Sequence, residues 1–265
     1  MPKLFKYFLA VMFIVIPTVA LANIYTNDAR KEITPDLQKQ FPFSIYGRLY
    51  GANRTCTAAL VGPDLIASAA HCVLRSEGRG IIRARFDFHL QYGRKRGYAD
   101  TAKVIDIKTG NQSMEHGSTS EMTRDRALMR IDKPLGNKYG FIPIEPTNYF
   151  DPTSTFHMIG YHSDRYNATQ MFRESGCRFR GMDGAYLNHD CSGAPASSGS
   201  PMIMIDKNNH IAIVALHNGG RASGPVEDLE PRPYGRSNTN GAVSANIFIG
   251  EYKRMLAESQ ARWKK

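Results

Sequence analysis

Three short segments place a histidine, an aspartate and a serine in that order along the chain, each next to an apolar run. His71 lies near the end of CTAALVGPDLIASAAHCV, Asp125 lies in TRDRALMRID, and Ser198 lies in HDCSGAPASSGSPMI. Acyl transfer with serine needs a hydroxyl nucleophile, a base with a pKa near neutrality and a carboxylate that fixes the tautomer of the base. These residues therefore predict Ser198 as nucleophile, His71 as general base and Asp125 as the group that orients the histidine.

Each of the three residues also has a structural explanation. A single histidine after a strand is more often a packing residue, and an aspartate before a strand is usually a turn or cap residue. Asp132 competes with Asp125, but Pro134 follows Asp132 at the far end of the expected strand. A Ser/Gly-rich linker around Ser198 would not run straight into the apolar residues 202–205. The three segments together favour catalysis.

The order His, Asp, Ser is that of chymotrypsin-like proteases and not that of subtilisin or the α/β-hydrolases. The histidine segment resembles the same region of this family, the stretch around Asp125 resembles its D-x-A-L motif, and Ser198-Gly199-Ser200-Pro201 resembles its nucleophile loop. Four further stretches resemble the bacterial glutamyl-endopeptidase branch: Asn27-Asp28-Ala29-Arg30, Gly160-Tyr161, Leu216-His217-Asn218-Gly219-Gly220 and Asn240-Gly241-Ala242-Val243. The resemblance implies a secreted serine endopeptidase (a hydrolase) and suggests a preference for glutamate before the scissile bond.

The same resemblance implies an all-β fold of two six-stranded antiparallel β-barrels of the chymotrypsin type with a C-terminal α-helix. From residue 43 onward, short β-branched and aromatic runs broken by Gly, Pro, Asn and Asp agree with an all-β fold. We expect strands at residues 44–50, 57–61, 65–69, 127–131, 156–161, 201–205 and 211–217. Residues 134–152 form the expected linker between an N-terminal barrel, 23–140, and a C-terminal barrel, 141–265.

The last segment changes to a helical period. Apolar residues recur near i, i+4, i+7 spacing after Asn246, the expected N-cap, and they are Phe248, Tyr252, Met255, Leu256 and Trp263. A membrane-surface helix would carry such a stripe, but a closing helix that docks on the second barrel needs it as well, and we favour the closing helix.

Small residues from Gly193 to Ser200 let the chain turn tightly and direct backbone N–H groups at one point, as an oxyanion hole requires. The resemblance assigns this hole to the N–H groups of Ala196 and Ser198. Ala196 departs from the family, which usually has glycine there. The position tends to need a positive φ, which costs a non-glycine residue roughly 1–2 kcal/mol.

The glutamyl-endopeptidase resemblance also implies substrate-binding residues. In that branch the acidic side chain of the substrate meets a histidine on the strand after the nucleophile, a hydroxyl and the N-terminal amine of the enzyme itself. His217 matches the histidine, Gly193 stands at the hydroxyl position with Ser192 beside it, and Asn23 would be the N-terminal residue. A packed histidine bonded to the backbone is the structural alternative for His217.

The four cysteines are an even number in a chain with an export signal, so we expect disulfides. Four cysteines allow three pairings, among which the sequence alone does not choose. The resemblance implies Cys56 with Cys72 and Cys177 with Cys191. Because these cysteines have no zinc-ligand spacing, we expect no metal, and we expect no cofactor.

Residues 1–22 have the pattern of a secretory signal peptide. Lys3 and Lys6 precede an apolar run, and Ala20-Leu21-Ala22 suits a signal peptidase. We expect a mature chain that begins at Asn23, is secreted or periplasmic, and is a monomer without stable membrane insertion. An uncleaved membrane anchor is the alternative.

The chain is basic, with a formal net charge of 34 − 24 = +10, or +8 without the two lysines of the leader. Such a surplus suits nucleic acid, anionic surfaces or simply solubility. The densest run, Arg94-Lys95-Arg96, lies between glycines without interleaved aromatic residues, so we expect a solvated hairpin tip and no nucleic-acid partner. Peptide or protein substrates are the expected partners. The alternatives are a catalytically impaired binding protein on a protease scaffold, suggested by Ala196, and a basic surface binder, suggested by the charge.

Overall fold

The computed structural model describes residues 22–75, 80–82, 84–113, 118–149, 151, 154–221 and 230–264, so the expected signal peptide lies outside the described residues except for Ala22. The strands are β1 (Lys31–Glu32), β2 (Tyr46–Gly51), β3 (Arg54–Leu60), β4 (Leu65–Ser68), β5 (Phe86–Leu90), β6 (Asp100–Thr109), β7 (Ala127–Ile131), β8 (Thr155–Tyr161), β9 (Met171–Cys177), β10 (Phe179–Asp183), β11 (Tyr186–His189), β12 (Pro201–Ile205), β13 (Ile211–Arg221) and β14 (Thr239–Ser244). The helices are α1 (Thr119–Met122), α2 (Leu135–Tyr139) and α3 (Ile249–Arg262), with 3-10 turns η1 (Leu37–Lys39), η2 (Phe43–Ile45), η3 (Ala70–Cys72), η4 (Tyr166–Ala168) and η5 (Ala245–Ile247). No helix in the described part of the chain is long and apolar enough to cross a bilayer.

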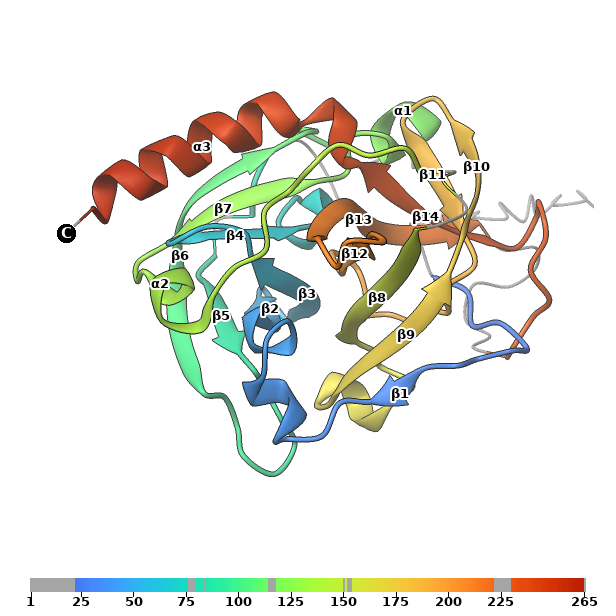
Figure 1. The fold of residues 1–265 in the computed structure, drawn as a ribbon, viewed down its shortest axis with the longest axis horizontal. Helices are drawn as coiled ribbons and strands as arrows, with labels where there is room; N and C mark the ends of the chain where they lie inside the picture. Colours follow the sequence, from blue (N-terminus) through green and yellow to red (C-terminus); the bar gives the residue numbers. More distant parts are fainter. Residues whose placement is uncertain are drawn as a thin grey trace, which may run out of the picture.

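The first half of the chain closes into a six-stranded barrel in the order β2-β3-β4-β7-β6-β5 (Figure 1). Strand β5 shows why its sequence suits a barrel wall. Phe86, Phe88 and Leu90 are buried, and the partly exposed Asp87 and His89 alternate with them. Because side chains alternate with a period of two residues, one face of the strand points into the core and the other points outward.

The second half forms an antiparallel sheet in the order β1-β9-β8-β12-β13-β14-β11-β10. The fold class is the expected one, but this sheet has eight strands where six were expected. The N-terminal segment supplies one of the two additional strands, β1, because Lys31 pairs with Arg173 of β9 and the Ile33 N–H donates to the Met171 carbonyl oxygen at 2.9 Å. The N-terminal segment therefore belongs by its pairing to the second half.

One apolar core cluster spans both halves, and a second cluster lies within the second half. Tyr161 of β8 and Leu216 of β13 are buried in the same cluster as Leu49 of β2 and Leu60 of β3. The Tyr161 hydroxyl also donates to the carbonyl oxygen of Tyr92, 3.0 Å away in the first half. Segments from both halves can thus contribute to one rigid site between them.

Helix α3 packs on the first barrel (Figure 1). The sequence analysis expected it on the second barrel, so that prediction was wrong. Arg130 of β7 donates to Glu258 of the helix at 2.5 Å, and the Ser259 hydroxyl donates to the buried carboxylate of Asp64. These polar partners on the first barrel fix the docking position, since a buried carboxylate is stable only when it is paired.

The expected N-cap of α3 was also wrong. Asn246 lies inside η5, where its N–H donates to the hydroxyl of Ser244 at 3.1 Å, and α3 begins after Phe248. The serine therefore caps a short turn that precedes the helix.

Candidate active site

Asp125 holds the imidazole of His71 through two hydrogen bonds. Its Oδ2 lies 2.7 Å from Nδ1 of His71, and its Oδ1 accepts the backbone N–H of the same residue at 2.8 Å. The Asp125 side chain is buried, whereas the His71 side chain is 22% exposed. A carboxylate on Nδ1 keeps the proton on that nitrogen and leaves Nε2 as the basic nitrogen.

The neighbouring elements fix the backbone around His71. Strand β4 leads directly into η3, which carries the histidine, and the Cys56–Cys72 disulfide ties η3 to β3. The guanidinium of Arg54 donates to the carbonyl oxygens of His71 and Leu74, both at 2.8 Å. The base is therefore held from the sheet side by a covalent bridge and by hydrogen bonds.

Ser198 lies in the loop between β11 and β12, and this loop packs against the segment that leads to His71. Gly199 has φ 81°, and a Cβ added there would lie 2.7 Å from the backbone nitrogen of Ala69. A side chain at position 199 is thus excluded. Ser198 is partly exposed, and within the described residues its Oγ makes no hydrogen bond to His71. Such bonds are often long before substrate binds.

Ala196 adopts the backbone conformation that the sequence analysis anticipated, with φ 75°. The N–H of the next residue, Ser197, is bonded within the loop, because it donates to the Ala194 carbonyl oxygen at 3.0 Å. In the described part of the chain, the N–H groups of Ala196 and Ser198 have no hydrogen-bond partner. Both donors are thus free to bind an oxyanion.

Thr57 stabilises this strained loop through hydrogen bonds. The sequence analysis did not identify this residue. Its hydroxyl donates to the Ala196 carbonyl oxygen at 2.9 Å and accepts the Tyr161 N–H at 2.9 Å, while its own N–H donates to the Ser198 carbonyl oxygen at 2.9 Å. Thr57 directly follows Cys56, and that position beside a disulfide cysteine is the signal that could have pointed to it.

Gly193 lies next to the ring of His217 and to Ala22. A Cβ added at Gly193 would lie 3.1 Å from Nε2 of His217 and 2.7 Å from Cβ of Ala22. The histidine is fully buried, and its Nε2 has no hydrogen-bond partner among the described residues. Burial and the nearby His189 lower the pKa of His217 well below its usual value, so the ring is neutral near pH 7.

His189 is a second buried histidine, which the sequence analysis did not assign. Its Nδ1 accepts the Cys191 N–H at 3.2 Å, and its Nε2 lies 3.1 Å from Nδ1 of His217. Burial lowers the pKa of His189 to about 3, so the ring carries one proton, which must sit on Nε2. If that proton is donated to Nδ1 of His217, the His217 proton lies on Nε2, the atom next to Gly193; the Gly241 carbonyl oxygen, 3.1 Å from the same Nδ1, is the competing partner.

Asn240 clamps the backbone of Asn23. Its Oδ1 accepts the Asn23 N–H at 2.5 Å, and its Nδ2 donates to the carbonyl oxygens of Asn23 and Cys191, both at 2.7 Å. The Gly193 N–H donates to the same Asn23 carbonyl oxygen at 2.8 Å. Asn23 is therefore bonded directly to Gly193, and its role in substrate binding stays a prediction; Asn240 itself was not singled out beyond its motif.

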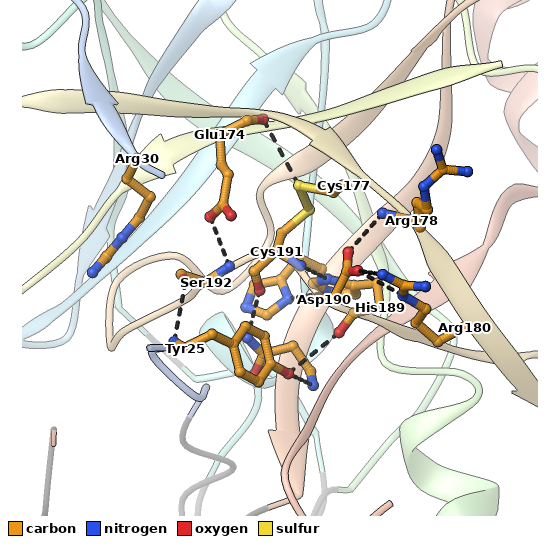
Figure 2. Close-up of a disulfide and its surroundings, with 12 residues drawn as sticks. Tyr25, Arg30, Glu174, Cys177, Arg178, Arg180, His189, Asp190, Cys191 and Ser192 are labelled. Carbon is orange, nitrogen blue, oxygen red and sulfur yellow. Dashed lines mark hydrogen bonds and ion pairs between the residues drawn. A yellow bond between two sulfur atoms is a disulfide. The ribbon is translucent and has the colours of Figure 1, made fainter. Parts of the chain in front are cut away.

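The hydroxyl of Ser192 is bonded to the backbone of Tyr25 and not to His217. Figure 2 shows that Ser192 stands between Glu174 and Tyr25: its N–H donates to Oε2 of Glu174 at 2.8 Å, and its Oγ accepts the Tyr25 N–H at 3.1 Å. Burial raises the pKa of Glu174 to about 7. The Cys177–Cys191 disulfide lies beside this row, and both disulfides have the pairing expected from the resemblance.

Within the described residues, the cluster with metal-ligand spacing comprises Cys56, His71 and Cys72. Its two sulfur atoms are joined in a disulfide, so neither can act as a thiolate ligand.

Comparison with solved structures shows the chymotrypsin-type serine protease fold. A Glu endopeptidase in complex with MPD has a TM-score of 0.67 at 19% identity, over 88% of this chain and 99% of that one. The protease Anisep from Arthrobacter nicotinovorans has a TM-score of 0.62 at 16% identity, over 83% and 98%. The thermostable serine protease AL20 from an extremophilic microorganism has a TM-score of 0.61 at 15% identity, over 81% and 97%.

The family follows from the sequence itself. Residues 56–213 match the trypsin-like peptidase domain, and the chain belongs to that family. This range contains His71, Asp125 and Ser198. A search of curated proteins gives no significant match.

Proposed function

We propose that the chain is an exported serine endopeptidase in which Ser198, His71 and Asp125 hydrolyse peptide bonds through an acyl-enzyme. The observation that carries this proposal is the double hydrogen bond from Asp125 to His71, next to a nucleophile loop in which two N–H groups are unpartnered. Two disulfides agree with an oxidising compartment outside the cytosol.

In the proposed reaction, Nε2 of His71 takes the Ser198 hydroxyl proton as Oγ attacks the peptide carbonyl carbon. The N–H groups of Ala196 and Ser198 hold the resulting oxyanion, and the imidazolium then gives its proton to the leaving amine. Water, activated by the same imidazole, hydrolyses the acyl-enzyme. Asp125 stays ionised and stabilises the imidazolium throughout.

A preference for glutamate or aspartate before the scissile bond is the proposed specificity. Nε2–H of His217 is a buried donor without a partner among the residues described, and a carboxylate would satisfy it. Cleavage after Ala22 would leave the α-ammonium of Asn23 on Asn240, close to the same glycine. A neutral imidazole donor and an ammonium together favour an acidic side chain.

A fluorophosphonate probe and a peptide-library digest test the proposed activity. We expect covalent labelling of the protein and cleavage of library peptides, with both lost in Ser198→Ala. If the protein is unlabelled, or if the alanine variant cleaves equally, the proposed nucleophile is wrong.

The specificity has its own test, which compares a chain that begins at Asn23 with one that retains Ala22. We expect the KM for substrates with glutamate before the scissile bond to be about tenfold higher when Ala22 is retained, because an ion pair in a desolvated site is lost. Equal KM values, or equal cleavage after glutamate and glutamine, would exclude this role of the N-terminus.

A further inference from the structure

A cavity of about 410 Å³ lies where the N-terminal segment runs beside the second sheet, and none of the proposed active-site residues lines it. Its lining residues are Ala29, Lys31, His157, Arg173 and Ser175. They come from the N-terminal segment with strand β1, from β8 and from β9, which lie side by side (Figure 1). This volume falls in the range of small-molecule sites.

The cavity places two cations opposite each other. Lys31 and Arg173 are direct cross-strand partners in the β1–β9 ladder. Like charges in this arrangement are destabilising. Neither side chain has an ion pair with a carboxylate anywhere in the described part of the chain. The adjacent Arg30, by contrast, is paired with both Asp28 and Asp164 at 2.7 Å.

His157 also lines the cavity, and it has a ring nitrogen that is unpaired among the described residues. Nε2 of His157 is buried and has no hydrogen-bond partner in the structure as described. Burial, together with Arg173, lowers the pKa of His157, so the ring is neutral at pH 7 and can donate one hydrogen bond. Arg173 is held in place with its guanidinium 5.7 Å from the ring centroid of Phe43. Ser175, an exposed residue of β9, also lines the cavity.

From this set of donors we infer that the cavity is a binding site for an oxyanion of the phosphate or sulfate type, carried on a small molecule or free. The ammonium of Lys31 supplies a point charge, and the planar guanidinium of Arg173 can bind two oxygens of the anion at once. A bound dianion would offset the repulsion between the two cations. It would also tie β1 to β9 and so stabilise the folded protein.

Thermal unfolding of the purified protein in inorganic sulfate tests this site, with sodium chloride added to hold the ionic strength constant. We expect a saturable rise of the Tm, of about 4 °C at sulfate ten times above Kd. The rise should be lost in Lys31→Gln and in Arg173→Gln. It should persist in the matched control Lys103→Gln, because Lys103 is an exposed strand lysine in the other half.

The outcomes separate the alternatives. A rise that does not saturate, or that is equal in all variants, is the general effect of sulfate on protein stability and overturns the site. No rise overturns it as well. Lys31 is exposed, so Lys31→Gln carries the test even if Arg173→Gln does not fold.

A second measurement identifies the source of the anion. The protein is cosedimented with phosphatidylglycerol vesicles and, for comparison, with phosphatidylcholine vesicles. A lipid headgroup is the source if binding to phosphatidylglycerol vesicles is lost in Lys31→Gln and kept in Lys103→Gln.

Discussion

The hydroxyl of Thr57 donates a hydrogen bond to the carbonyl oxygen of Ala196, 2.9 Å away, and so joins the first barrel to the strained peptide of the nucleophile loop. The same side chain accepts the Tyr161 N–H. The Thr57 N–H also donates to the Ser198 carbonyl oxygen at 2.9 Å, so one residue of β3 is bonded to both Ala196 and Ser198. The conformation of Ala196 costs roughly 1–2 kcal/mol and persists because bonds of this kind support it.

Thr57→Val should lower kcat by about tenfold to a hundredfold while changing KM little, because it removes the hydroxyl and keeps the shape of the side chain. The rate of fluorophosphonate labelling should fall with kcat. Thr57→Ser keeps the hydroxyl and should restore most of the activity. If the valine and serine variants lose activity equally, Thr57 fills space and does not position the loop.

Ala196→Gly should remove the backbone strain at φ 75°. Glycine adopts this conformation without steric cost but loses more entropy on folding, so we expect stability to rise by only about 0–1 kcal/mol in denaturant unfolding. The rate of labelling at Ser198 should stay equal or rise. A loss of stability above about 1 kcal/mol would mean that the alanine methyl group makes packing contacts that outweigh the strain.

The sequence allowed the prediction of the fold class, because the motifs that indicate it are local, whereas the catalytic roles of Ser198, His71 and Asp125 stay a prediction. Strands β7 (Ala127–Ile131) and β12 (Pro201–Ile205) have the predicted bounds, since each is an apolar run between clear breakers. The first predicted strand began two residues too early, because residues 44 and 45 belong to the turn η2.

Long-range contacts could not be predicted from the same motifs. The docking of α3 depends on Asp64, which lies 195 residues from Ser259 in the chain, and the apolar stripe of the helix does not specify the barrel on which it packs. The pairing of His189 with His217 likewise depends on the β11–β14 and β13–β14 ladders, which bring two distant strands together. The division of the chain into domains 23–140 and 141–265 stays a prediction.

His189→Leu should weaken the proposed preference for acidic substrates without changing the nucleophile. Without the donor from His189, the His217 proton can move to Nδ1 and bind the Gly241 carbonyl oxygen, 3.1 Å away. The KM for glutamate substrates should rise by about tenfold, and fluorophosphonate labelling of Ser198 should be unchanged. His189→Gln retains a donor and should keep more of the discrimination between glutamate and glutamine. Identical specificity in both variants would contradict the tautomer argument.

Glu174→Gln should change the dependence of stability on pH. The folded-state pKa of Glu174 is raised from 4.5 to about 7, chiefly by burial. Between these pH values the folded protein holds a proton that the unfolded chain has released, so this residue makes stability fall as pH rises from about 4.5 to 7. Well above pH 7 the buried carboxylate costs on the order of 3 kcal/mol.

Glutamine cannot ionise, and its Oε1 can still accept the Ser192 N–H that Oε2 of Glu174 accepts at 2.8 Å. We therefore expect Glu174→Gln to be more stable than the wild type at pH 8, with the difference shrinking as pH falls toward 5, in denaturant unfolding at a series of pH values. Glu32→Gln, at an exposed strand position, is a suitable control and should follow the wild type. A constant difference between Glu174→Gln and wild type at every pH would show that Glu174 does not titrate in this range. A lower stability of Glu174→Gln at pH 8 would show that the charge itself stabilises the loop that carries Ser192 and Gly193.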